Sequence, residues 1–185
     1  MESLTYGVEY ILMLSASKRN RRLKLRTATI RDLDLVQYWD TKQHVIDCDP
    51  EDDWDWEHEL NRNPEWREQL IAEIDDKPIG FIQIIDPLLE ETHYWGEVEP
   101  NNRAIDIWIG EEHNLNKGYG TKMMNLAIEK CFENDLVDGI LIDPLKSNTK
   151  AQRFYERLGF EFAEERDFDG TRCIVYKLKR KKANR

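Results

Sequence analysis

The stretch LNKGYGT, at residues 115–121, decides the fold, because it places two glycines one residue apart where a loop meets a helix. Upstream, NNRAIDIWIG at 101–110 alternates apolar and polar residues as a strand does. Downstream, KMMNLAIEKCF at 122–132 is amphipathic, and its apolar stripe has the spacing of one helical face: Met124, Ala127, Ile128 and Cys131. The sequence therefore predicts a strand, a glycine turn and a helix in succession.

A glycine turn at a helix start can bind anions. The first N–H groups of a helix have no partner within it, and the absence of Cβ atoms at Gly118 and Gly120 lets a ligand approach the main chain. Lys117 adds a positive charge. The spacing is not G-x-x-x-x-G-K-[ST], and the third glycine of a dinucleotide fold is missing, so neither ATP nor NAD is favoured. A phosphate-binding loop and an ordinary tight turn remain the two interpretations.

The other elements surround this unit on both sides. Thr29 and Asp32 have capping-box spacing at a helix start. In chain order, we expect a strand at 22–28, a helix at 29–39, a hairpin of 68–74 with 79–85, the strand at 101–110, the glycine loop and its helix, a buried strand at 138–143, a helix at 147–159, and a hairpin of 160–165 with 172–178. This order predicts one α/β (α+β) domain with a mixed sheet.

Composition also favours one domain, with an acidic surface. A chain of 185 residues can bury one sizeable core, and its net charge of −10 disfavours nucleic acid and favours a cationic partner. The three cysteines share no C-x-x-C spacing, so we expect neither a disulfide framework nor a metal site. No signal or membrane segment is visible, which suits the cytoplasm. We divide the chain into an N-terminal extension at 1–22, the domain at 23–178 and a basic tail at 179–185.

Two linked motifs resemble those of the GNAT superfamily of acetyl-CoA-dependent N-acetyltransferases. The first is the glycine loop, whose family form is Q/R-x-x-G-x-G/A; Leu115 stands here where Gln or Arg is usual. The second is N-x-x-A-x-x-F-Y-E-x-x-G-F, at 148–160. The resemblance implies a mostly antiparallel central sheet flanked by helices, with a V-shaped opening between central parallel strands. It also implies acetyl-CoA as cosubstrate, held by Ile107, Trp108, Ile109, Asn116, Lys117, Gly118, Tyr119, Gly120, Thr121, Asn148 and Tyr155.

Within the superfamily, three segments look like the aminoglycoside 6'-N-acetyltransferases. They are RAID at 103–106, NKGYGTK at 116–122 and DPLKSNTKAQRFYERLGF at 143–160. The same segments do not separate the drug-modifying enzymes from relatives that acylate hydroxylysine in siderophore synthesis. The resemblance therefore implies an amine acceptor without fixing which amine it is.

Acetyl transfer to an amine needs a base and an acid. Asp106, on the strand beside the loop, is the candidate base, and a carboxylate on a solvated strand face is the alternative. Tyr155 lies where family members present a hydroxyl to the coenzyme sulfur, so we expect it to be the general acid; a core tyrosine beside Phe154 is the alternative. Asn148 has the residue type of a helix N-cap and is also expected to contact the coenzyme.

The remaining acids are candidates for holding a cationic acceptor. We expect Glu97, Glu99, Asp106 and Asp143 to bind the substrate, since Asp143 ends a buried strand and the two glutamates precede the Asp106 strand. Residues 47–59 hold eight acids around two tryptophans and add an acidic rim, or else form a charged segment fixed by core tryptophans. Trp54, Trp56 and Trp95 are candidate flat surfaces for a sugar. The four histidines show no metal-ligand spacing.

Three functions remain open on the sequence. The first is acetylation of the 6'-amine of aminoglycosides by a monomer or homodimer. The second is acetylation of another amine, such as a siderophore hydroxylamine, a polyamine or a protein N-terminus. The third is a non-catalytic coenzyme-A-binding module with a regulatory role. The acidic segment favours polycations over peptides, and the pair of Asp106 with Tyr155 argues against the third.

Overall fold

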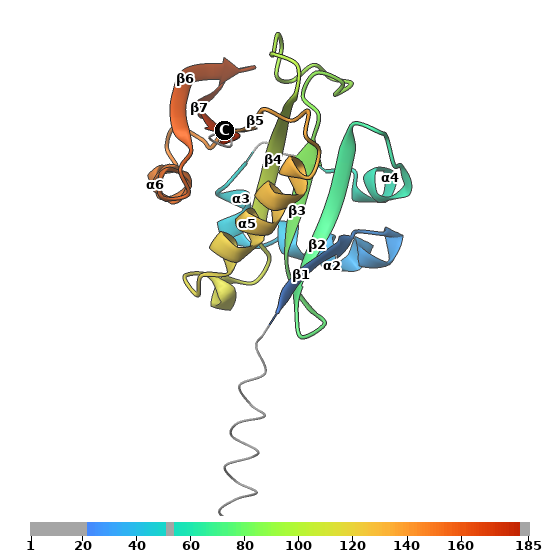
Figure 1. Cartoon of the computed structure of the whole chain (residues 1–185). Coiled ribbons are helices and arrows are strands. Elements are labelled where there is room, and N and C mark those ends of the chain that lie inside the picture. The colour runs from blue at the N-terminus through green and yellow to red at the C-terminus, as the bar shows by residue number, and fades with distance from the viewer. Residues whose placement is uncertain (1–21, 51–53, 182–185) are drawn as a thin grey trace, which may run out of the picture.

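A computed structural model describes residues 22–50 and 54–181 (Figure 1). Within these residues one seven-stranded sheet has the order β1-β2-β3-β4-β5-β7-β6. Its strands are β1 (Leu23–Thr27), β2 (Arg67–Ile74), β3 (Lys77–Ile85), β4 (Asn102–Ile109), β5 (Gly139–Ile142), β6 (Glu161–Phe168) and β7 (Thr171–Lys179). In this part of the chain β4 and β5 are the one parallel pair, and the other neighbours are antiparallel. The predicted mixed α/β (α+β) sheet is confirmed.

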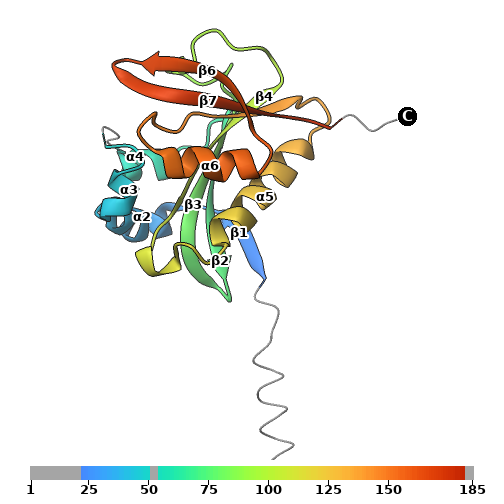
Figure 2. The same cartoon turned by 90° about the vertical axis from the view of Figure 1, so that its left-hand side faces the viewer.

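Helices cover both faces of the sheet. The helical segments are η1 (Ile30–Asp32), α2 (Leu33–Asp40), α3 (Gln43–Ile46), α4 (Trp56–Asn61), η2 (Glu112–Asn114), α5 (Tyr119–Phe132) and α6 (Thr149–Arg157). Figure 2 shows α2, α3 and α4 on one side of the sheet and α5 on the other, with α6 beneath the β6–β7 hairpin. No helix of the described residues is long and apolar enough to cross a membrane.

Strand β4 separates two cores because its side chains alternate. Ile105 is buried with the stripe of α5, and Ile107 packs against the same cluster. On the opposite face, Trp108 packs against a cluster under α2 and α4 that includes Trp39 and Phe81. The predicted division of β4 into two faces is confirmed, as is the apolar stripe of α5, which also includes Met123.

The sheet opens between its two parallel strands. The β4–β5 pairing covers three positions, from Asn102 opposite Gly139 to Ala104 opposite Leu141, whereas β4 continues to Ile109. Beyond Ala104, one edge of β4 is therefore no longer paired with β5. This geometry is the V-shaped opening that the resemblance implies.

Helices α2 and α5 begin at residues other than those that the sequence predicts. The segment predicted as one helix at 29–39 is a 3-10 turn followed by α2, because Thr29 and Asp32 form a reciprocal capping box before the α-helix begins. Helix α5 starts at Tyr119, three residues earlier than expected, so the second glycine of the loop belongs to its first turn. The predicted extension at 1–22 and tail at 179–185 lie mostly outside the described residues.

Candidate active site

The glycine loop leaves the start of α5 without a side-chain cap. Gly118 is the N-cap residue with a φ of 77° and a ψ of 6°, and no side chain hydrogen-bonds to the first turn there. Asn116, two residues earlier, also has a positive φ, of 59°. The first backbone N–H groups of a fourteen-residue helix therefore stay available to a ligand, and the helix dipole favours an anion.

The two glycines of the loop serve different purposes. At Gly118 the positive φ favours glycine, and a Cβ would meet nothing within 4 Å. Gly120 has no such φ, and a Cβ there would lie in ordinary contact, 3.6 Å from Phe154 and 3.8 Å from Ile109. The fold itself therefore has room for a methyl group at Gly120. A ligand that approaches the main chain closely explains the glycine, as the pyrophosphate of coenzyme A would.

The free edge of β4 offers main-chain groups to the opening. The N–H of Gly110 donates to the carbonyl of Ile79 at 3.0 Å, which fixes the phase of the β3–β4 ladder. Because bonded residues alternate in an antiparallel pair, the N–H and C=O groups of Ile107 and Ile109 point away from β3, towards the opening. His44 lies 2.8 Å from the Ile109 carbonyl through its Nε2 atom. Sequence reasoning gave His44 no role.

Trp108 is placed differently from its two neighbours. Its ring stacks on Phe81 with 4.6 Å between centroids and also lies near Trp54 and Trp56, in the aromatic cluster of the opposite face. By the same alternation its main chain bonds towards β3. Of the three predicted β4 contacts to the coenzyme, this geometry favours Ile107 and Ile109.

Helix α6 carries the predicted general acid, Tyr155. Its N-cap residue Asn148 accepts a hydrogen bond from the N–H of Ala151 at 3.0 Å, so the predicted capping role is confirmed. Tyr155 is buried in the core that α5 and α6 share. Burial is the main cause that raises the pKa of its hydroxyl, and the nearby charges of Asp106 and Asp143 add to it. Tyr155 is therefore protonated at neutral pH, as a general acid must be.

Asp106 extends from β4 on the face opposite Ile105. It is half-buried, and the side-chain amide of Gln83 donates to its Oδ2 atom at 3.0 Å. Gln83 is the residue directly opposite Asp106 on β3. Asp106 is close enough to Tyr155 and Tyr94 for its charge to raise the pKa of both hydroxyls. The predicted base and the predicted acid thus lie in one electrostatic neighbourhood.

Asp143 follows β5 and is held by a residue that sequence reasoning missed. The hydroxyl of Tyr94 donates to Asp143 Oδ2 at 2.6 Å, and the Tyr94 ring stacks on Phe168 with 4.4 Å between centroids. Burial is the main cause that raises the pKa of Asp143 to about 6; the Tyr94 hydrogen bond lowers it and the charge of Asp49 raises it. Tyr94 gave no sequence signal, because its partners are 49 and 74 positions away along the chain.

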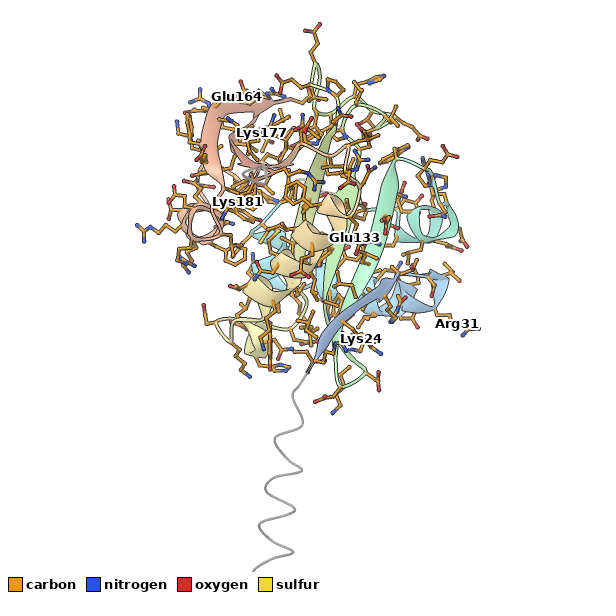
Figure 3. The ribbon with its side chains drawn as sticks, in the orientation of Figure 1. Lys24, Arg31, Glu133, Glu164, Lys177 and Lys181 are labelled. Carbon is orange, nitrogen blue, oxygen red and sulfur yellow. The ribbon has the colours of Figure 1, made fainter. Side chains whose placement is uncertain are left out.

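The two predicted glutamates have different surroundings. Glu97 is exposed and lines a surface depression of about 530 Å³ beside Tyr94 and the β6–β7 hairpin. Glu99 forms an ion pair with Lys177 of β7 at 2.9 Å, and its side chain is 80% exposed (Figure 3 labels Lys177). The charge of Glu99 is therefore already balanced, whereas Glu97 has no such ion pair among the described residues.

The tryptophans near the acids are structural. Trp56 and Trp95 are 2% and 3% exposed, so neither offers a flat surface to a sugar. Trp54 is half-buried and stacks on Trp56 at 4.7 Å. Trp54 and Trp56 thus pack with the core aromatics, which favours the second interpretation of this acidic segment; its residues 51–53 lie outside the described residues. Asp49 still contributes to the acidic rim through its effect on Asp143.

Comparison with known proteins places this geometry in a family. The family model described as acetyltransferase (GNAT) domain matches residues 29–168 of this chain. Aminoglycoside N(6')-acetyltransferase type 1 of Klebsiella pneumoniae is 30% identical over 156 residues, 77% of this chain and 75% of that protein. Lysine N-acyltransferase MbtK of Mycolicibacterium paratuberculosis is 25% identical over 168 residues, 83% and 72% of the two chains.

Solved structures agree with the sequence relatives. The crystal structure of aminoglycoside acetyltransferase AAC(6')-Ib in complex with coenzyme A and kanamycin has a TM-score of 0.77 at 27% identity, covering 86% of this chain and 95% of that one. The uncapped start of α5 and the space at Gly120 suit the same coenzyme here. The chain belongs to the GNAT family of acetyltransferases, and its cosubstrate is acetyl-CoA.

Proposed function

We propose that this enzyme acetylates the 6'-amine of aminoglycoside antibiotics in the cytoplasm and thereby confers resistance to them. The observation that carries the proposal is that Asp106 on β4 and Asp143 directly after β5 lie where these two strands are no longer paired, and the charges of both carboxylates act on Tyr155. An aminoglycoside has several ammonium groups, so it suits a site with more than one carboxylate. The names of the relatives support the same acceptor class.

In the proposed reaction, Asp106 and Tyr155 transfer protons and Asp143 positions the acceptor. Acetyl-CoA supplies an acetyl group as a reactive thioester. Asp106 accepts a proton from the substrate ammonium, directly or through water, so that the amine can attack the thioester carbonyl. Tyr155 donates its proton to the departing thiolate, and the second proton, which the acetylated nitrogen must lose to become an amide, restores the tyrosine hydroxyl. Asp143 holds a second ammonium group of the acceptor and so orients the reacting amine.

The cosubstrate is held by main-chain groups in this proposal. The N–H groups at Gly118, Tyr119, Gly120 and Thr121 bind the pyrophosphate, and Asn116 with Lys117 borders it. Leu115 replaces a polar side chain of the family pattern, which removes a side-chain contact but leaves the amides in place. The edge of β4 that is not paired with β5 offers the main-chain groups of Ile107 and the N–H of Ile109 to the amides of the pantetheine arm, as a sheet edge pairs with an added strand, while the Ile109 carbonyl is held by His44.

A small-amine acceptor is the second candidate, because relatives with that activity match parts of the chain. The probable spermine N(1)-acetyltransferase of Bacillus subtilis is 30% identical over 86 residues, and the lysine N-acyltransferase has been described above. A polyamine or a hydroxylysine also has an ammonium group for Asp143. Both alternatives keep the roles of Asp106 and Tyr155, whereas a non-catalytic module would need neither.

One assay panel tests these alternatives. Thiol release from acetyl-CoA is measured with kanamycin, spermidine, hydroxylysine and a peptide as acceptors. We expect kanamycin to have the highest kcat/KM, and an aminoglycoside with a hydroxyl in place of the 6'-amine to give no release. Turnover of spermidine or hydroxylysine but of no aminoglycoside would replace the proposed acceptor. Coenzyme A binding by calorimetry with no release from any amine would favour the non-catalytic module.

A further inference from the structure

Two buried glutamines form a chain of amides that ends at Asp106. Gln69 of β2 and Gln83 of β3 are 8% and 4% exposed. The Nε2 of Gln69 donates to the Oε1 of Gln83 at 3.2 Å, and the Nε2 of Gln83 donates to Asp106 at 3.0 Å. The three residues are direct cross-strand neighbours, so one row crosses β2, β3 and β4.

The direction of this chain follows from its two ends. An ionised carboxylate only accepts hydrogen bonds, so Gln83 must turn its N–H groups towards Asp106 and its carbonyl the other way. Gln69 donates to that carbonyl and therefore stabilises this amide orientation over the flipped one. If Gln69 presented its carbonyl oxygen instead, the Gln83 amide would rotate to donate to that oxygen and would then turn its own oxygen towards the carboxylate, which cannot donate. Gln69 thus influences Asp106 although no contact joins them.

A neutral donor suits the task better than a charged one. An Arg or Lys in place of Gln83 would hold the carboxylate but would cancel its charge, and the site would lose its attraction for an ammonium group. An amide orients the carboxylate with a hydrogen bond and leaves the net negative charge in place. Burying two glutamines also costs free energy unless they are hydrogen-bonded, and an apolar pair could fill the same space.

We infer that Gln83 and Gln69 are positioning residues for the proposed base, with Gln83 aiming the Asp106 carboxylate and Gln69 fixing the Gln83 amide. The inference rests on the proposed function in that Asp106 is the base. It adds that the proton-accepting carboxylate is held by side chains of β2 and β3, which belong neither to the glycine loop nor to α6, the helix of Tyr155. The row should therefore act on the rate of proton transfer and leave cosubstrate binding unchanged.

Volume-conserving substitutions test the row. Gln83→Met should lower kcat about tenfold and Gln69→Met about threefold, with the KM for acetyl-CoA unchanged, because a hydrogen bond to a charged group is lost in the first and an amide orientation in the second. In the double variant, Gln69→Met should have no further effect, because its influence passes through Gln83. Ile85→Val is the control: Ile85 is buried two positions along β3 on the same face, and makes no polar side-chain contact.

Each alternative outcome has a distinct meaning. Normal kcat in a folded Gln83→Met enzyme, or an equal loss of kcat from Ile85→Val, would overturn the inference, as would a Gln69→Met effect that persists in the double variant. If Gln83→Met does not fold, Gln83→Asn is used instead, since its shorter amide cannot reach both partners. Loss of activity in Asp106→Asn with normal kcat in the glutamine variants would leave the proposed function intact and reject the row alone.

A spectroscopic measurement tests the row without any acceptor. In ¹⁵N spectra, the side-chain NH₂ signal of Gln83 is identified by its absence from Gln83→Met. We expect this signal to shift in Asp106→Asn and in Gln69→Met, and to keep its position in Ile85→Val. An unshifted signal in the first two variants would mean that no such row exists in solution, whatever amine the enzyme acetylates.

Discussion

The two sides of the opening are built from different parts of the chain. The main-chain side consists of the β4 edge at Ile107 and Ile109 and the glycine loop at 115–121, and it offers backbone groups from one continuous segment. The carboxylate side consists of Asp106, Asp143, Tyr94 and Glu97, and it offers side chains from β4, the residue after β5 and the loop before β4. The main-chain side binds its ligand with backbone groups of one continuous segment, and the carboxylate side binds its ligand with side chains that are far apart in the sequence.

This difference predicts where substitutions act. Backbone groups bind a phosphate whatever side chains surround them, so the main-chain side tolerates the Leu115 departure from the family pattern. The carboxylate side has no such tolerance, because each charge or hydroxyl belongs to one residue. Substitutions on the main-chain side should therefore alter coenzyme affinity, and those on the carboxylate side should alter turnover and acceptor binding.

The largest effect should come from Asp106→Asn. The amide cannot accept a proton, so kcat should fall by about 10²- to 10⁴-fold, the range that general acid–base groups contribute. Coenzyme A affinity, measured by calorimetry, should stay within about twofold, since Asp106 is not on the main-chain side. A variant that keeps most of its turnover would show that another group accepts the proton.

Tyr155→Phe should have the next largest effect. Removing the hydroxyl leaves the thiolate without its proton donor, and turnover should fall by on the order of a hundredfold. The ring contacts with Phe154 and Phe160 remain, so thermal stability should barely change. Phe160→Leu is the matched control for packing, and it should lower the melting temperature with little loss of turnover per folded enzyme. Equal behaviour of the two variants would assign Tyr155 to packing alone.

The two loop glycines should separate binding from stability. Gly120→Ala puts a methyl group where the protein has room, so the fold should keep its stability while the Kd for coenzyme A rises about tenfold through crowding of the phosphates. Gly118→Ala forces a side chain into the left-handed region and should lower the free energy of unfolding by about 1 kcal/mol. Calorimetry and chemical denaturation measure the two. Unchanged affinity for coenzyme A in Gly120→Ala would mean that the phosphates do not approach the main chain at Gly120.

These two sides also differ in how far the sequence alone reveals them. The main-chain side was predictable because its strand, loop and helix are consecutive and their periodicity is local. On the carboxylate side, Asp143 was found from a strand end and Asp106 from its place on the strand beside the glycine loop. Tyr94 and Gln83 were not found, since each acts through a partner on another element. Trp108 lies on the face of β4 opposite Ile105, as strand alternation predicts, and its ring packs into the core under α2 and α4. Its contact with the coenzyme stays a prediction.

A smaller effect should appear in the pH dependence of acceptor binding. Asp143 is ionised above its pKa of about 6 and protonated below it, so affinity for an ammonium group should fall as the pH drops through about 6. The Tyr94 hydrogen bond lowers this pKa, so Tyr94→Phe should move the midpoint to higher pH. Calorimetric titration of kanamycin between pH 5 and 8 measures the midpoint. The same midpoint in the wild type and in Tyr94→Phe would mean that Asp143 does not take part in acceptor binding.

The smallest effect should come from the two glutamates, of which Glu97 lines the surface depression and Glu99 does not. Glu97→Gln removes a negative charge that lines the surface depression and has no ion pair among the described residues, so the KM for kanamycin should rise about two- to threefold. Added salt should make this difference from the wild type smaller, because the charge is exposed. Glu99→Gln changes the net charge by the same one unit, because it leaves Lys177 without its partner, but Glu99 does not line this depression, so its effect on the KM should be smaller. Steady-state kinetics at about 0.05 and 0.5 M salt compare the two variants. A larger effect from Glu99→Gln would mean that the acceptor displaces Lys177 from this ion pair and binds Glu99 itself.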